Sequence, residues 1–218
     1  MPQVKAVVFD LDGTLLDSLG DIADSANEVL SSRGYATFSD DSYRYFVGEG
    51  VRQLFDRALP AGDVNEDIVQ GCMDDFKQVY RRRWNIRSVL YDGIAELLVA
   101  LVGRGIRMAV LSNKPHEATL RCVNYFLADH PFDHVFGQRE GVPRKPDPTA
   151  ANEIKSSLSL TGEQCLYVGD TATDMQTAVG SEMIAVGVEW GFRPREELLE
   201  NGARHLVQQP SMLLELVG

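Results

Sequence analysis

Residues 4–18 read VKAVVFDLDGTLLDS, and this stretch decides the fold. Five of its first six residues are apolar, three of them valine, and such a nearly continuous apolar run is typical of a strand that is covered on both faces. Asp10 and Asp12 follow directly, and Gly13 allows the chain to turn sharply behind them. Two carboxylates this close repel each other. The pattern therefore predicts that other segments place positive charge beside them.

Similar apolar runs recur later in the chain and predict further strands. They cover residues 106–111, 165–169 and 183–188, with weaker candidates near Val135 and Leu206. Helical patterns lie between them, at residues 94–103, 117–127, 149–158, 173–179 and 196–200. Strands that alternate with helices predict an α/β domain with a doubly wound parallel sheet.

Residues 18–87 do not alternate and predict a separate helical domain. Ser18 and Gly34 bracket a periodic apolar face, as the start and stop of a first helix would. Two shorter helices are expected over residues 39–50 and 51–60, and a longer one over 66–84. We therefore predict an α/β core of residues 1–17 and 88–218, interrupted by a helical domain of residues 18–87.

The composition limits the possible partners of the protein. Apolar residues make up 44% of the 218 residues, and the formal net charge is −11, so the overall field repels nucleic acid and anionic membranes. The basic run at residues 81–83 is expected to be a solvated helix face. No apolar run reaches the roughly 20 residues of a membrane span, and no signal peptide is recognisable. We expect a monomer in the cytoplasm.

The three cysteines, Cys72, Cys122 and Cys165, are far apart in the sequence. Their odd number and wide spacing argue against a disulfide framework and against a zinc site. We expect reduced, buried thiols.

Four polar clusters stand where the predicted strands end or where a helix begins. The clusters are Asp10–Thr14, Ser112–Lys114, Arg144–Pro148 and Gly169–Thr171, the last with Asp174 one helical turn beyond. The carboxyl ends of parallel strands share one edge of a sheet, where ligands of such folds bind. We therefore expect these side chains to converge. Ser112 is also expected to cap the helix after Pro115, whereas Asn113 and Lys114 line either the site or a loop.

The residue types in these clusters suit phosphoryl transfer. Several carboxylates at one place require a cation, and a small set of hard oxygen ligands favours Mg²⁺. One of Asp10 and Asp12 can attack phosphorus while the other handles a proton. Thr14 and Ser112 offer hydroxyls to phosphate oxygens, and Lys145 supplies a positive charge that neutralises the attacking carboxylate.

The chain resembles the haloacid dehalogenase superfamily in its large phosphatase branch. FDLDGT, LSN, KPDP and VGDTATD match the four family motifs in order. The resemblance implies a Rossmann-like core with an all-helical cap domain inserted after the first motif. It also implies that Asp10 is the nucleophile, Asp12 the acid and base, and Lys145 a catalytic residue. Mg²⁺ would be held by Asp10, the backbone carbonyl of Asp12 and Asp170, with Asp174 at the edge.

The cap segment FVGEGVRQLFDRAL, at residues 46–59, is similar to that of phosphoglycolate phosphatases. This resemblance implies that Gly48, Gly50 and Arg52 lie near the substrate. Arg52 could bind a substrate carboxylate, or it could be a solvated helix residue. Trp190 lies in a further segment common to these phosphatases, and packing suffices to explain it.

The expected function is Mg²⁺-dependent hydrolysis of a small phosphorylated metabolite through an aspartyl-phosphate. A pyrophosphatase or a sugar-phosphate phosphatase would share these residues. A β-phosphoglucomutase-like isomerase would share every catalytic residue, although Thr14 favours hydrolysis. A regulatory phosphate-accepting receiver domain fits less well, because receivers are shorter and have no inserted domain.

Overall fold

The computed structural model describes residues 3–218, which form two compact units. The first unit runs to Leu16 and resumes at Leu90, and the second comprises residues Asp17–Val89. The predicted boundaries, after residues 17 and 87, lie within two residues of this division. Across residues 3–218, no helix combines the length and apolar character that a bilayer crossing requires.

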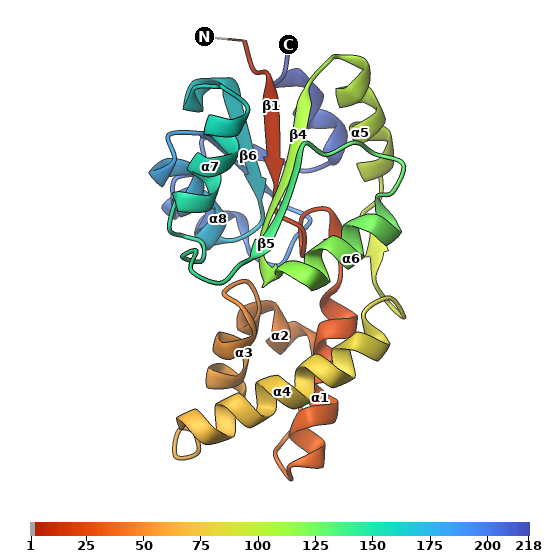
Figure 1. Ribbon diagram of the computed structural model, residues 1–218, viewed down its shortest axis with the longest axis vertical. Coiled ribbons are helices and arrows are strands. Elements are labelled where there is room, and N and C mark those ends of the chain that lie inside the picture. The colour runs from red at the N-terminus through yellow and green to blue at the C-terminus, as the bar shows by residue number, and fades with distance from the viewer. Residues whose placement is uncertain (1–2) are drawn as a thin grey trace. The chain divides into compact units, whose positions relative to one another are not determined.

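The first unit is built on a six-stranded parallel sheet in the order β5-β4-β1-β6-β7-β8 (Figure 1). Its strands are β1 (Ala6–Phe9), β4 (Arg107–Pro115), β5 (His134–Gln138), β6 (Cys165–Gly169), β7 (Ile184–Val188) and β8 (His205–Val207). The α/β prediction is confirmed, and both weak candidates are strands. β1 is central and fully buried, which explains its continuous apolar run.

Helices cover both faces of this sheet. They are α5 (Ile94–Gly103), α6 (His116–Phe126), α7 (Thr149–Ser157), α8 (Ala172–Gly180) and α9 (Arg195–Glu200), with 3-10 turns at Gly162–Gln164 and Pro210–Glu215. In Figure 1, α7 and α8 lie to one side of the sheet and α5 to the other. Ile154 of α7 and Met175 of α8 pack with Val8 and Ala109 of the sheet, so the core continues across the strands.

Strand β4 is longer than predicted. It extends through Ser112, Asn113 and Lys114 to Pro115, with a shift of its register against β5 between Leu111 and Pro115. These residues were expected to follow the strand. Their place on an irregular strand end fixes their backbone more firmly than a loop would.

The second unit contains α1 (Leu19–Ser32), α2 (Asp40–Phe46), α3 (Val51–Ala58) and α4 (Glu66–Arg83). Short strands β2 (Leu16–Asp17) and β3 (Val89–Leu90) pair where the chain enters and leaves it. Tyr43, Phe55 and Phe76 contribute to its core, and Phe76 stacks on Tyr80. The helical character predicted for this segment is therefore found.

The start of α1 and the end of α4 carry residues for which the sequence predicts a role. Ser18 occupies the N-cap position of α1, as predicted, but its side chain makes no cap hydrogen bond. The basic run at the end of α4 is a partly exposed face, as expected. There Arg82 pairs with Glu28 and Arg83 with Asp24, both on α1.

Asp21 of α1 ties the two ends of the helical unit together. Its buried carboxylate accepts hydrogen bonds from the backbone N–H groups of Ile86, Arg87 and Ser88 and from the Ser88 hydroxyl, at 2.7–3.1 Å. These residues directly precede β3. A single carboxylate thus satisfies three successive backbone donors at the exit of the unit.

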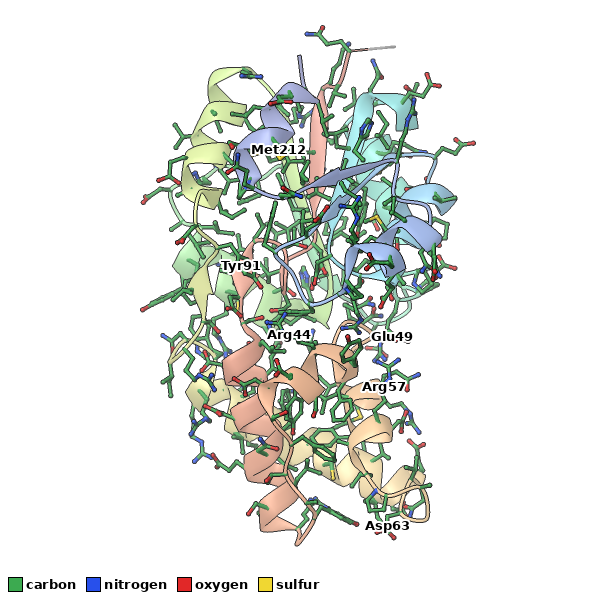
Figure 2. All side chains as sticks on the ribbon, turned by 180° about the vertical axis from the view of Figure 1, so that it is seen from behind. Arg44, Glu49, Arg57, Asp63, Tyr91 and Met212 are labelled. Carbon is green, nitrogen blue, oxygen red and sulfur yellow. The ribbon has the colours of Figure 1, made fainter. Side chains whose placement is uncertain are left out.

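Arg57 of α3 fastens the loop that joins α2 to α3. It donates to the carbonyls of Tyr45 and Phe46 and pairs with Glu49, beside which Figure 2 shows it. Gly48 and Gly50 in this loop have positive φ values of 109° and 92°, which other residues rarely adopt.

Candidate active site

Three buried aspartates converge at the carboxyl ends of β1 and β6. Asp10 follows β1, Asp170 follows β6, and Asp174 lies in the first turn of α8. Each offers a carboxylate oxygen, and these oxygens lie within 4.8 Å of one another. The expected convergence of these side chains is therefore present. Asp174 is one of the three, and its place in a metal shell stays a prediction.

Lys145 lies among these carboxylates. Its Nζ is 3.0 Å from Asp10 Oδ1 and 2.6 Å from Asp174 Oδ1, and it donates to the Leu111 carbonyl at 3.0 Å. Asn113 holds the lysine backbone: its Oδ1 accepts from Lys145 N, and its Nδ2 donates to Lys145 O. Asn113 therefore positions Lys145. The sequence had left open whether Asn113 lines the site or a loop.

Burial and the neighbouring carboxylates oppose ionisation of Asp10 and Asp170. Burial raises the pKa of Asp10 to about 7, and Asp174 adds to the rise while Lys145 opposes it. Burial, Asp174 and Asp10 likewise raise the pKa of Asp170 well above its ordinary value. Burial opposes the charge on Lys145, but Asp10 and Asp174 outweigh it and raise the lysine pKa. One ammonium group does not balance three buried carboxylates.

The group fits a hard divalent cation. Its donors are carboxylate oxygens, as Mg²⁺ prefers. Their orientations are fixed by neighbours: Asp170 accepts from the Thr14 hydroxyl at 3.1 Å and from Phe192 N at 2.8 Å. Asp174 accepts from the hydroxyl and the N–H of Thr171. Such outer contacts are what orients metal ligands in proteins.

Asp12 has a different environment. Lys114 Nζ contacts its two carboxylate oxygens at 2.8 and 3.0 Å, and the two side chains are 5% and 17% exposed for lysine and aspartate. The Asp12 side chain is outside the group of three carboxylates. The metal role predicted for its backbone carbonyl stays a prediction. The partial exposure leaves Asp12 open to a ligand.

The two predicted phosphate-binding hydroxyls lie on the same edge of the sheet. Thr14 donates to Asp170, and Ser112 Oγ accepts from Lys114 N at 3.3 Å. Ser112 does not cap the following helix: Pro115 occupies the N-cap position of α6. That capping prediction is wrong, because β4 continues through Ser112. Phosphate binding by either hydroxyl stays a prediction.

Gly50 and Arg52 belong to the helical unit. Gly50 precedes the first turn of α3, and the Arg52 guanidinium forms two hydrogen bonds with Glu66, at 3.0 and 2.7 Å. Arg52 is therefore an ion-paired, partly exposed helix residue in this structure. Its predicted contact with a substrate carboxylate, and that of Gly50 with the substrate, stay predictions.

Sequence reasoning singled out Trp190 in the segment after β7 but assigned it only packing, and so missed the contacts that this segment makes with the site. Trp190 Nε1 donates to the Thr14 carbonyl at 3.0 Å, and Phe192 N holds Asp170. Gly191 lies between them, where a Cβ would stand 2.2 Å from Asp170 Cβ. The WGF tripeptide therefore braces both the first motif and the metal-binding candidate Asp170. The glycine beside an aromatic residue was the one local signal.

Comparisons with known proteins agree with this geometry. The family model of haloacid dehalogenase-like hydrolases matches residues 7–188. The phosphoglycolate phosphatase of Colwellia psychrerythraea is 30% identical, over 93% of this chain and 92% of that protein. That of Rhodospirillum rubrum is 33% identical, over 91% and 85%.

Solved structures agree as well. A candidate phosphoglycolate phosphatase from Lactobacillus delbrueckii subsp. bulgaricus superimposes with a TM-score of 0.93 at 30% identity, covering 99% of this chain and 98% of that one. One from Haemophilus somnus gives 0.92 at 27% identity, with both chains fully covered. With the family motifs gathered at one edge of the sheet, these matches establish that the chain belongs to the haloacid dehalogenase-like hydrolases.

Proposed function

We propose that this hydrolase is a Mg²⁺-dependent phosphatase of small phosphate monoesters, with 2-phosphoglycolate as its leading substrate. The observation that carries the proposal is the placement of Asp10. This buried carboxylate touches Lys145, lies in a group that suits a divalent cation, and is two residues from a second, lysine-paired carboxylate. The names of the relatives support the choice of substrate.

In the first step, a carboxylate oxygen of Asp10 attacks phosphorus. The new O–P bond forms as the ester P–O bond breaks, and the protonated carboxyl of Asp12 gives its proton to the departing alcohol oxygen. The products are the alcohol and an aspartyl-phosphate on Asp10. In the second step, Asp12 takes a proton from a water molecule that attacks phosphorus. The bond between phosphorus and the Asp10 oxygen breaks as the bond to the water oxygen forms, so Asp10 is regenerated and inorganic phosphate leaves.

The surrounding residues neutralise and orient the reacting groups. Asp10, Asp170 and Asp174 would hold Mg²⁺, which supplies positive charge to the transferring phosphoryl group. Lys145 keeps Asp10 in place and balances part of its charge. Thr14 and Ser112 offer hydroxyls to the phosphate oxygens. The helical unit, inserted between β1 and α5, would serve as the cap that selects the leaving group.

The test is phosphate release from 2-phosphoglycolate by the purified protein with Mg²⁺. We expect kcat/KM above about 10⁴ M⁻¹s⁻¹, a value typical of enzymes on their own substrates. Asp10→Asn should abolish release, because an amide cannot form the acyl phosphate. Wild-type activity in that variant would contradict the mechanism.

The same assay separates the alternatives. Faster phosphate release from pyrophosphate or from a sugar phosphate would identify that compound as the better substrate and would leave the proposed mechanism unchanged. Conversion of a hexose 1-phosphate to the 6-phosphate without net phosphate release would replace hydrolysis by isomerisation.

A further inference from the structure

We propose that Lys114 is the residue that binds the carboxylate of the leaving group, and that the substrate carboxylate competes with Asp12 for it. The inference rests on the proposed function, and it names the chemical feature that the site selects: an acidic group close to the phosphate ester. Lys114 would then be a specificity-determining residue, a role that the sequence left open for Arg52.

Lys114 is expected to lie close to the leaving group because its ammonium contacts Asp12. In the proposed mechanism, a carboxylate oxygen of Asp12 meets the ester oxygen of the substrate. In 2-phosphoglycolate the carboxylate carbon is two bonds from that oxygen. The Lys114 ammonium is 2.8 and 3.0 Å from the Asp12 oxygens. A cation that contacts the acid and base directly is therefore within reach of a carboxylate so close to the ester.

The backbone of Lys114 is held firmly in place. Its N–H donates to Ser112 Oγ, and its carbonyl accepts the Thr119 hydroxyl at 3.2 Å. Gly137 of β5 approaches so closely that a Cβ there would stand 2.6 Å from the Lys114 oxygen. The lysine thus projects from a rigid strand end, as a residue that fixes substrate orientation should.

Lys145, the other lysine of this site in the first unit, is held within the buried cluster. Its Nζ contacts Asp10, Asp174 and the Leu111 carbonyl. Of these two lysines, Lys114 is the one that pairs with Asp12, the carboxylate proposed to handle the leaving-group proton.

The first experiment compares 2-phosphoglycolate with 2-hydroxyethyl phosphate, which replaces the carboxylate with a neutral group. We expect Lys114→Met to lower kcat/KM for 2-phosphoglycolate by about 10²-fold, as expected for loss of a hydrogen bond between charged groups. The value for 2-hydroxyethyl phosphate should change less than about threefold. Lys155→Met, which removes a partly buried lysine of α7, is the matched control and should preserve the ratio of the two values.

The second experiment measures binding without turnover. In an Asp12→Asn background, calorimetry with Mg²⁺ should show that adding Lys114→Met weakens 2-phosphoglycolate binding about 10²-fold. Binding of inorganic phosphate should stay the same. Thermal unfolding checks that each variant is folded, and Lys114→Gln replaces the methionine variant if that one is not.

The outcomes are distinct. An equal loss of kcat/KM for both substrates, with unchanged 2-phosphoglycolate binding, would mean that Lys114 acts only through Asp12 and would overturn the inference. If wild-type protein hydrolyses 2-hydroxyethyl phosphate as fast as 2-phosphoglycolate, the inference fails and the phosphatase proposal stands. If it hydrolyses neither and binds no phosphate, the proposed function fails and the inference falls with it.

Discussion

Asp170 lies between two glycine backbones that leave its side chain little freedom. A Cβ built on Gly13 would stand 2.2 Å from Asp170 Oδ2, and one on Gly191 would stand 2.2 Å from Asp170 Cβ. Gly13 also has a φ of 86°. The glycine of the first motif therefore serves both the turn after β1 and the close approach of a carboxylate from β6.

Gly13→Ala should both destabilise the fold and weaken Mg²⁺ binding. The positive φ costs roughly 1–2 kcal/mol for a residue with a Cβ, and displacement of Asp170 should weaken Mg²⁺ binding about tenfold. Thermal unfolding and calorimetric titration with Mg²⁺ measure the two effects.

Gly34→Ala is the matched control for that variant. Gly34 has a φ of 79° but no atom within 4 Å of a built Cβ. The Gly34→Ala variant should lose stability but keep normal Mg²⁺ affinity. Normal affinity in Gly13→Ala as well would show that the crowding of Asp170 does not matter for the metal.

Lys145→Met removes an ammonium that touches both Asp10 and Asp174. We expect kcat to fall about 10³-fold, as for loss of a preorganised charge in an active site. The metal-free protein should lose about 3–5 kcal/mol of stability, because buried carboxylates are left without their cation. Mg²⁺ should restore part of the melting temperature. An unchanged melting temperature without Mg²⁺ would argue against the buried ion pairs.

Helix α1 carries acidic residues in two environments, and they should contribute differently. Asp21 is fully buried and accepts from three backbone N–H groups and a hydroxyl. Asp24, one turn later, pairs with Arg83 and Arg87 at a surface where its side chain is 31% exposed. Asp21 is buried and therefore stabilises the helical unit, whereas solvent screens the charge of Asp24.

Asp21→Ala should destabilise the protein by about 3 kcal/mol or more, because it leaves several buried donors unsatisfied. Asp24→Ala should cost about 0–1 kcal/mol, as for a surface ion pair. Denaturant unfolding of both variants provides the comparison. Equal losses would mean that the Asp21 contacts contribute no more than a solvated pair.

The acidic cluster should make the stability of the whole molecule depend on pH and on metal. The folded-state pKa of Asp10 is about 7, against an ordinary value of 3.8. Between these pH values the folded protein holds a proton that the unfolded chain has released. The contribution of Asp10 to the free energy of unfolding therefore falls as pH rises through this window and levels off above about 7.

Asp10→Asn removes this titration and provides the test. In the absence of Mg²⁺, its melting temperature relative to wild type should rise between pH 5 and pH 8. Mg²⁺ should stabilise the wild-type protein more at pH 8 than at pH 5.5, because at the lower pH it must displace a proton. A difference between the two proteins that is constant across this range would contradict the raised pKa.

Much of the fold and the core of the site could be predicted from local patterns. Contiguous residues make up the apolar runs of β1 and β6 and the helical periodicity between them. Such patterns can be recognised without knowledge of distant contacts, because burying their apolar side chains is favourable in any fold. Asp10, Asp170 and Asp174 were found because each follows a strand or opens a helix at one edge of a parallel sheet. Side-chain caps were less predictable than helix positions, as Ser18 shows, because a cap is one of several bonds that a hydroxyl can make.

The sequence by itself determined the α/β alternation, the inserted helical segment and the acidic residues that gather at the strand ends. The place of Lys145 beside Asp10 could also be predicted, but only the tertiary structure decided most other pairings of cations with carboxylates. Lys114 reaches Asp12 across 102 positions, Trp190 reaches the Thr14 carbonyl across 176, and Arg52 pairs with Glu66. Among 21 basic and 32 acidic residues, many pairings have similar energies in water. The folded backbone selects among them, because it fixes which side chains are close and which are removed from solvent.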